Sequence, residues 1–353
     1  MRFDGERNGW TQPVAPPPAP RRSGRLPLAA IRPDYDLIAV NGNRLVVNGQ
    51  PTAPPAGRIC AVSYRAELQP SARELLSHLV TRHSSVVSRS RITGGRTVED
   101  FEAAGAEDAV WSLSSATAAA AALLGHQVRE VGGGAQVDAV RVDTTGVAER
   151  DIVVAVDGRQ VATASDLRSA LAGKNEVRLT VLRTGADGRP EAPRTARLRR
   201  HPDGAWGMRV VTAERKLEHG IVAEFDLPDD LRGPSLGLAC ALSIVDACTG
   251  GILAAAGTVV ATGTVDLAGR VGGVGAIDFK ARAVAAHQDV RRFIVPAESA
   301  TDVEDARRVL GGKAEVVAVT TLAEAVEVLR GLARRSGKLV HRSADRWTGA
   351  AMQ

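Results

Sequence analysis

The chain has 353 residues, of which 44% are hydrophobic, 24% charged and only 3% aromatic. This length is enough for two or three domains, and the composition is that of a folded globular protein, not of a disordered or fibrous one. The net charge of +5 is spread over short Arg-Arg pairs without aromatic neighbours, so we expect solvated basic faces and no nucleic-acid surface.

The cysteines and histidines give no sign of a metal or of disulfides. The chain has an odd number of cysteines, namely Cys60, Cys240 and Cys248. Its 7 histidines are scattered and do not have the spacing of metal ligands. We therefore expect reduced thiols, no metal and no other cofactor. The first residues lack the apolar stretch of a secretory signal, and no long apolar run predicts a membrane span, so a cytoplasmic location is expected.

Residues 1–33 are rich in proline and polar residues and are predicted to be a disordered tail. Residues 34–120 are expected to form a small α/β segment that packs against the next domain. Its predicted elements are a hairpin at 36–49 turning at Asn41-Gly42-Asn43, a strand at 59–64, and helices at 71–83, 98–105 and 110–124.

Residues 121–203 have the pattern of a small β-domain. Strands are predicted at 137–142, 151–159 and 177–183, with a helix at 164–171 before the last of them. This order resembles the circularly permuted PDZ domain of bacterial proteases, which implies that a peptide is added as an extra strand and its carboxylate held by backbone amides. The candidate carboxylate nest is Leu124-Gly125-His126. A small β-domain without a peptide groove is the alternative.

A candidate nucleophile lies in the segment from Gly233 to Gly237, where Ser235 precedes an apolar run without charge before Asp246. Such a run predicts a helix that is buried on most sides, with Ser235 at its N-terminus. Unpaired amides and the positive end of the helix dipole favour a developing oxyanion there. Gly233 and Gly237 would let the backbone approach a substrate carbonyl closely.

A serine hydroxyl needs a base to take its proton, and Lys280 is the candidate. It lies at the edge of the apolar stripe formed by Ile277, Ala281 and Val284 on a predicted helix. Desolvation disfavours the charged ammonium, so we expect its pKa to fall from about 10.4 towards about 8. A fraction of the amine would then be neutral near pH 7, as a general base must be.

These segments resemble, over roughly residues 205 to 332, the Lon-type proteolytic domain, a Ser-Lys dyad peptidase. The resemblance implies that Ser235 is the nucleophile, that Lys280 is the general base and that the Thr262 hydroxyl lies beside the lysine. It also implies protein or peptide substrates and the possibility of a homo-oligomer. The blocks that carry it are 233–237, 260–271, 274–280 and 293–297.

Two other functions remain open from the sequence. The pentapeptide around Ser235 also fits G-x-S-x-G, the pattern of an α/β-hydrolase with a Ser-His-Asp triad, for which His287 or His341 would supply the base. That fold needs a strand running directly into the serine, whereas the preceding residues 226–232 are polar. The second alternative is a catalytically silent peptide-binding scaffold.

No nucleotide-binding loop is evident, because Gly173-Lys174-Asn175 and Gly312-Lys313-Ala314 lack the glycine spacing and the Ser or Thr of a Walker A motif. We therefore expect an ATP-independent peptidase on residues 204–334, followed by a loose basic tail at 335–353. The expected fold class is α+β: a mixed α/β N-terminal segment, a PDZ-like β-domain and a Lon-type α/β domain.

Overall fold

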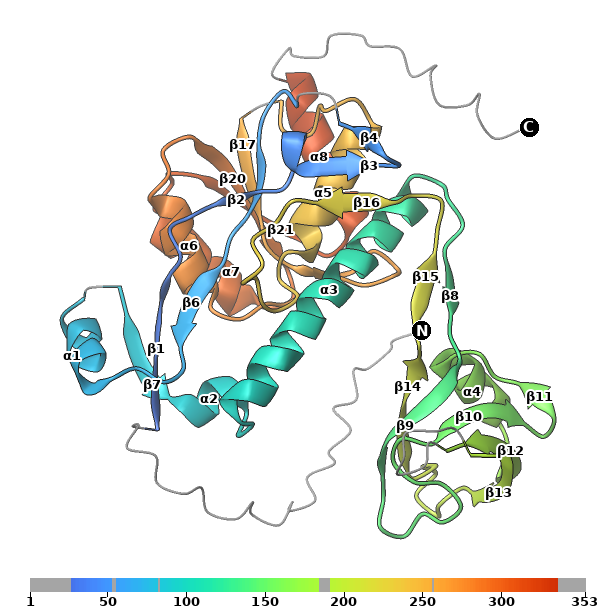
Figure 1. The fold of residues 1–353 in the computed structure, drawn as a ribbon. Helices are drawn as coiled ribbons and strands as arrows, with labels where there is room; N and C mark the ends of the chain where they lie inside the picture. Colours follow the sequence, from blue (N-terminus) through green and yellow to red (C-terminus); the bar gives the residue numbers. More distant parts are fainter. Residues whose placement is uncertain (1–26, 53–54, 82, 184–190, 256, 336–353) are drawn as a thin grey trace.

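The computed structural model describes residues 27–52, 55–81, 83–183, 191–255 and 257–335. They form a large body of helices and sheets and a small β-domain, which are joined by a two-stranded ribbon (Figure 1). This mixture of helices and sheets agrees with the predicted α+β class. None of the described helices combines the length and the apolar character that a membrane span requires.

A five-stranded sheet forms the centre of the body, in the order β2-β5-β17-β20-β21. The last four strands run parallel, and β2 pairs antiparallel with β5 at one edge. Their residues are mostly Val, Ile and Ala because both faces of the sheet are covered. The strands are β2 (Ile38–Ala39), β5 (Ile59–Ala61), β17 (Thr258–Ala261), β20 (Val290–Pro296) and β21 (Glu315–Val319).

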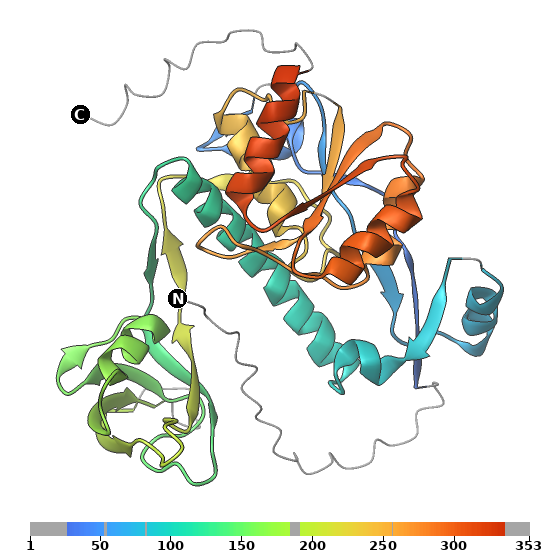
Figure 2. The same ribbon diagram turned by 180° about the vertical axis from the view of Figure 1, so that it is seen from behind.

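Helices cover both faces of this sheet, as Figures 1 and 2 show from opposite sides. Residues of α3 (Val98–Leu123), α5 (Gly237–Cys248) and α8 (Leu322–Arg335) share one hydrophobic core cluster with the sheet. Residues of α6 (Ile277–Ala285) and α7 (Ala300–Leu310) share the other. The helices α5 and α6 carry the candidate site. They lie on opposite faces of the sheet and contact the neighbouring strands β17 and β20.

The N-terminal segment is not a separate unit, which corrects the predicted boundary at residue 120. Its strand β5 pairs with β17 in the central sheet, and the buried alanines of α3 pack in the same core as α5. The two helices predicted at 98–105 and 110–124 are one helix. Gly105 does not end it, because this glycine faces Arg232 closely and its carbonyl accepts a hydrogen bond from the Gly233 amide at 2.7 Å.

Two smaller sheets flank the body, and they correct two predictions. Leu28–Pro33 form β1, paired with β6 (Tyr64–Glu67) and β7 (Ser85–Ser88), so the predicted tail is in part a strand; residues 1–26 lie outside the described part. The predicted hairpin turn at Asn41 is wrong. The hairpin joins β3 (Leu45–Val47) to β4 (Gln50–Pro51) through Asn48 and Gly49, which both have positive φ as a type I′ turn requires.

Short elements complete the body. A 3-10 turn, η1, spans Gly42–Arg44, and β16 (Ala223–Phe225) pairs with β3. The helix α1 (Ala72–Val80) begins with a capping box between Ser71 and Glu74, and α2 (Arg89–Thr93) follows β7. The hairpin of β18 (Thr264–Val265) and β19 (Val271–Gly272) leads from the central sheet towards α6.

The small β-domain has the predicted strands and its helix α4 at the predicted residues, Ala164–Leu171. Its sheet order is β13-β12-β10-β9-β14, with β11 paired to β10. The last strand, β14, extends the domain to Ala213, beyond the predicted end at 203. The strands are β9 (Gly134–Val140), β10 (Ile152–Val156), β11 (Arg159–Gln160), β12 (Glu176–Leu182), β13 (Arg194–Arg199) and β14 (Met208–Ala213).

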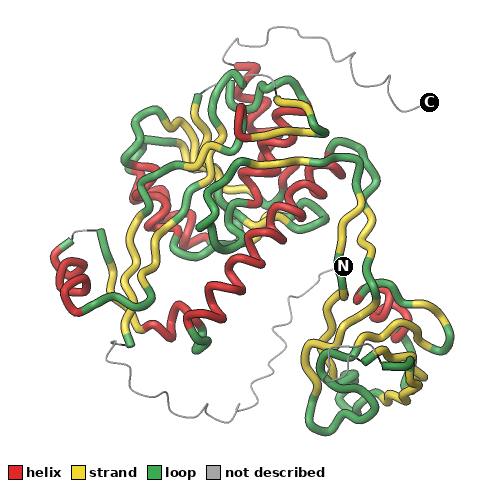
Figure 3. Tube along the Cα trace, viewed as in Figure 1, coloured by secondary structure: helices red, strands yellow, loops and turns green. Residues whose placement is uncertain are grey.

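A ribbon of β8 (Arg129–Val131) and β15 (Lys216–Glu218) carries the small domain away from the body (Figure 3). Inside the domain, the carboxylate of Asp151 is fully buried and accepts hydrogen bonds from Arg183 at 2.6 Å and Arg194 at 2.7 Å. These arginines hold the pKa of Asp151 below its usual range against the effect of burial. The carboxylate thereby ties the start of β10 to β12 and β13.

Candidate active site

Ser235 lies in the turn that leads into α5. The helix itself begins at Gly237, and its first residues are apolar and fully buried, as predicted. The Ser235 side chain is half-buried. Its backbone carbonyl accepts hydrogen bonds from the Gly263 amide at 2.9 Å and from Thr262 Oγ1 at 3.4 Å, so the end of β17 fixes this turn.

The two glycines beside Ser235 have structural roles of their own, one in the turn and one in helix packing. Gly233 has φ 81°, a left-handed conformation that favours glycine. At Gly237 an added Cβ would lie 2.8 Å from Ser112 Oγ on α3, so only glycine lets α5 approach that helix. Ser112 Oγ also donates to the Pro234 carbonyl at 2.8 Å, which anchors the turn from the other side.

The first amides of α5 are not free to bind an oxyanion, contrary to the expectation from the sequence. The Gly237 amide donates to the Pro234 carbonyl at 3.3 Å, and the Leu238 amide donates to the Gly263 carbonyl at 3.0 Å. What α5 still provides at Ser235 is the positive end of its dipole.

Lys280 on α6 is one of the largest fully buried side chains, with 1% of its surface exposed. Its Nζ donates to Thr262 Oγ1 at 3.2 Å. Burial disfavours the charged ammonium and lowers the pKa of Lys280 to about 7. This is lower than the value of about 8 expected from the sequence, because the side chain lies inside the core and not at its edge.

Thr262 connects the two candidate residues. Its hydroxyl accepts from Lys280 Nζ and donates towards the Ser235 carbonyl, and the whole residue is buried. Thr262 directly follows the strand β17, and its amide donates to the Ile294 carbonyl of β20 at 3.0 Å. The structure therefore brings Ser235, Thr262 and Lys280 together at the carboxyl end of a central parallel strand, the usual place for a site in an α/β sheet.

Residues 205–331 match the family model of the Lon protease (S16) C-terminal proteolytic domain. This part of the chain is similar to that proteolytic domain. The match contains α5, β17, α6 and β20, and thus all three residues that meet at the site. Among curated proteins, no match to the chain is found.

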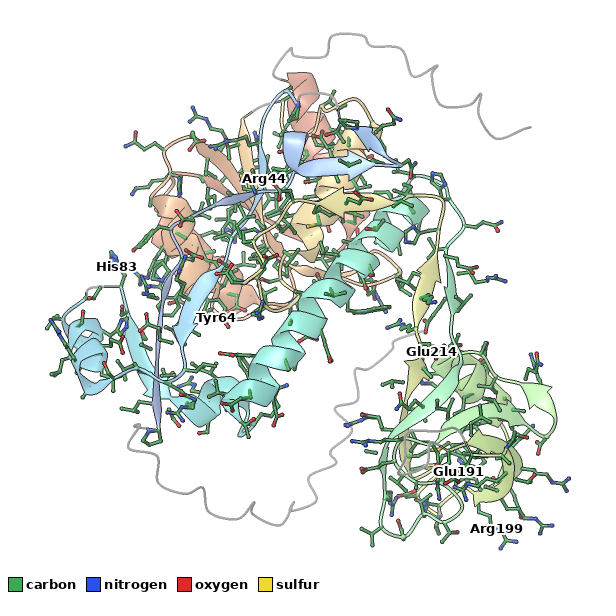
Figure 4. The ribbon with its side chains drawn as sticks, viewed as in Figure 1. Arg44, Tyr64, His83, Glu191, Arg199 and Glu214 are labelled. Carbon is green, nitrogen blue, oxygen red and sulfur yellow. The ribbon has the colours of Figure 1, made fainter. Side chains whose placement is uncertain are left out.

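Tyr64 is a neighbour of the site that sequence reasoning missed. It begins β6 (Figure 4), outside the residues that match the family model. Its ring centroid lies 5.9 Å from Lys280 Nζ. Burial raises the pKa of its phenol, so the ring presents a neutral, largely apolar wall to the amine. A single tyrosine at the end of the strand predicted at 59–64 carries no signal that could have placed it beside Lys280.

The predicted carboxylate nest at Leu124-Gly125-His126 is wrong. These residues end α3, and all three amides donate to carbonyls of the helix itself, those of Ala120 to Ala122, at 2.9–3.1 Å. Gly125 has φ 91°, as expected at a helix C-terminus. The segment therefore caps a helix and has no free amide for a peptide carboxylate.

The structure gives no support to the Ser-His-Asp alternative. The strand before Ser235, β16, ends at Phe225, and the loop 226–234 separates the two, so there is no sharp strand-to-helix elbow at the serine. His287 Nε2 donates a hydrogen bond to the backbone carbonyl of Tyr35, 2.7 Å away, beyond the C-terminal end of α6. His341 lies outside the described residues.

The low pKa of Lys280 predicts the pH dependence of the reaction. Only the neutral amine can act as base, so kcat/KM on a short peptide should rise about tenfold per pH unit below pH 7 and level off above it. Rates measured between pH 5.5 and 9, with folding followed by circular dichroism, test this. A flat profile below pH 7, or a plateau reached only near pH 10, would contradict a buried lysine base.

Proposed function

We propose that the chain is a serine endopeptidase with a Ser-Lys dyad, Ser235 as nucleophile and Lys280 as general base. The observation that carries the proposal is a fully buried lysine with a pKa near 7, joined through Thr262 to the turn that holds Ser235. A buried amine costs stability, and such residues are concentrated where chemistry requires them.

The proposed reaction begins when the neutral Lys280 amine accepts the hydroxyl proton of Ser235 as its oxygen attacks a peptide carbonyl. One N–H of the amine is held by Thr262, which leaves the lone pair for this proton. The resulting ammonium returns the proton to the leaving amine, and water then hydrolyses the acyl-enzyme with the same base. Burial favours each return of Lys280 to the neutral state.

We further propose that this chain works without ATP of its own and that its small β-domain recruits unfolded or tagged proteins. Lys174 and Lys313 both follow the C-terminal ends of helices, α4 and α7, where the helix dipole repels phosphate. In a phosphate loop the lysine precedes the N-terminus of a helix instead. The resemblance of the small domain to PDZ domains supports recruitment.

Covalent labelling tests the nucleophile. A fluorophosphonate probe should modify Ser235 of the folded chain, with the adduct located by peptide mass spectrometry. The rate of labelling should follow the fraction of neutral Lys280 and rise between pH 6 and 8. Failure of the folded protein to label at Ser235 at any pH would favour the second candidate, a catalytically silent scaffold.

A further inference from the structure

The strand β14 occupies the edge of the small β-domain along β9. The two strands pair antiparallel over the length of β14, from Met208 opposite Val140 to Ala213 opposite Gly134. On its other side, β9 pairs with β10 over two residues only. The pairing of β9 is thus supplied mainly by a strand that follows the rest of the domain in the sequence.

Side chains of β14 alternate between the domain and solvent. Met208 and Val210 pack against the core cluster of the small domain, whereas Val211 is 46% exposed. The Thr212 hydroxyl accepts from the Ala164 amide at the start of α4, at 3.0 Å, and donates to Glu130 at 2.6 Å. The strand therefore lies in a groove between β9 and α4, with every second side chain directed into it.

Glycines close the groove at the end of β14. The Gly133 amide donates to the Ala213 carbonyl at 2.9 Å. At Gly132 an added Cβ would lie 2.4 Å from Thr212 Cγ2 and 2.6 Å from the Ala213 oxygen, so the glycine lets β14 approach. An added strand with alternate side chains in pockets, and its last carbonyl oxygen held by a glycine-rich loop, has the form of a bound peptide.

We propose that β14 is a built-in occupant of the groove between β9 and α4 and keeps this groove closed to peptides. An extended peptide with aliphatic residues at alternate positions binds only by displacing β14. This inference deepens the recruiting role proposed above and rests on it. It also moves the recognition site away from the end of α3, to the glycine run 132–134.

The position of β14 joins this groove to the active site. Glu214, labelled in Figure 4, follows the strand, and the Arg215 guanidinium after it stacks on the Trp111 ring of α3, 3.7 Å from its centroid. The next residue on α3, Ser112, holds the Pro234 carbonyl beside Ser235. Displacement of β14 therefore loosens a contact one residue away from the support of the nucleophile turn.

The test measures binding of a fluorescein-labelled peptide with the sequence of residues 205–213 to the full chain carrying Ser235→Ala, which excludes cleavage. Adding Val210→Asp, which places a charge on the face of β14 that packs in the groove, should tighten binding at least tenfold because the peptide replaces the weakened strand. The matched control is Val211→Asp, on the outward face of the same strand, and it should leave the affinity unchanged.

Hydrogen exchange of the Ser235→Ala parent gives a second measurement that needs no change in β14. Excess peptide should speed exchange at the amides of β14 and leave those of β9 protected, because the peptide takes over the pairing. If folded Val210→Asp binds no more tightly than the parent, or if the peptide leaves β14 protected, the inference is wrong. Labelling of Ser235 would be unaffected by that result, so the two proposals fail separately.

Discussion

Replacing Ser235 or Lys280 by alanine should lower kcat/KM for an unstructured protein substrate by at least about 10⁴-fold. Ser235→Ala removes the nucleophile, and Lys280→Ala removes the base that the hydroxyl requires. Because the two residues act as one unit, the double variant should be no slower than the slower single variant. Peptide products separated by chromatography give the rates, with folding verified by circular dichroism.

The variant His287→Ala tests whether a histidine, and not Lys280, is the general base. The ring of His287 contacts the Tyr35 carbonyl and not the turn of Ser235, so we expect its loss to change kcat/KM less than twofold. Because Lys280 has a pKa near that of histidine, a pH profile cannot distinguish the two bases by its midpoint, and the variants must. Activity retained in Lys280→Ala and lost in His287→Ala would assign the protein to the triad class.

Local patterns were sufficient to predict the elements that carry the site. The apolar run after Ser235 and the stripe around Lys280 both form buried helices, and α4 begins and ends at the predicted residues. Each of these depends on side-chain periodicity and caps within one element, which a sequence shows directly. The burial of Lys280 was also predicted, although its extent was underestimated.

Contacts between distant segments could not be predicted in the same way. The pairing of β5 with β17 joins residues that are far apart in the sequence, and no periodicity marks it. Gly105 indicated a helix end because glycine inside a helix costs about 1 kcal/mol relative to alanine. The packing of Gly105 against Arg232 outweighs that cost. Tyr64 reaches Lys280 only because both the sheet and α6 are in place.

The boundaries of the Lon-type domain follow from the same long-range contacts. The matched residues 205–331 contain the nucleophile and the base, but β5 and α3, which precede the small domain in the sequence, complete the central sheet and support the turn of Ser235. The small domain is therefore inserted between two parts of one structural body. Residues 205–331 alone would lack the partner strand of β17 and the helix that packs on α5.

Lys280→Met should abolish activity and at the same time stabilise the fold. The folded chain holds Lys280 at a pKa of about 7, against 10.5 for a free lysine side chain, so unfolding takes up a proton between these two pH values. The wild-type protein therefore becomes more stable as pH rises from 7 towards 10.5. Below pH 7 the amine is charged in both states, and the free-energy cost of burying its charge is constant. Methionine has a similar volume, fills the site without a charge and escapes this penalty.

We expect Lys280→Met to raise the free energy of unfolding by on the order of 4 kcal/mol at pH 7, and Tm by roughly 5 to 10 °C. The gain should shrink by about 1.4 kcal/mol per pH unit above pH 7 and disappear near pH 10, where the unfolded lysine is also losing its proton. Thermal unfolding at pH 6 to 10 gives both quantities. Lys216→Met, at an exposed position on β15, should change Tm little at any pH. A gain for Lys280→Met that does not vary with pH would mean that packing, and not the buried amine, accounts for it.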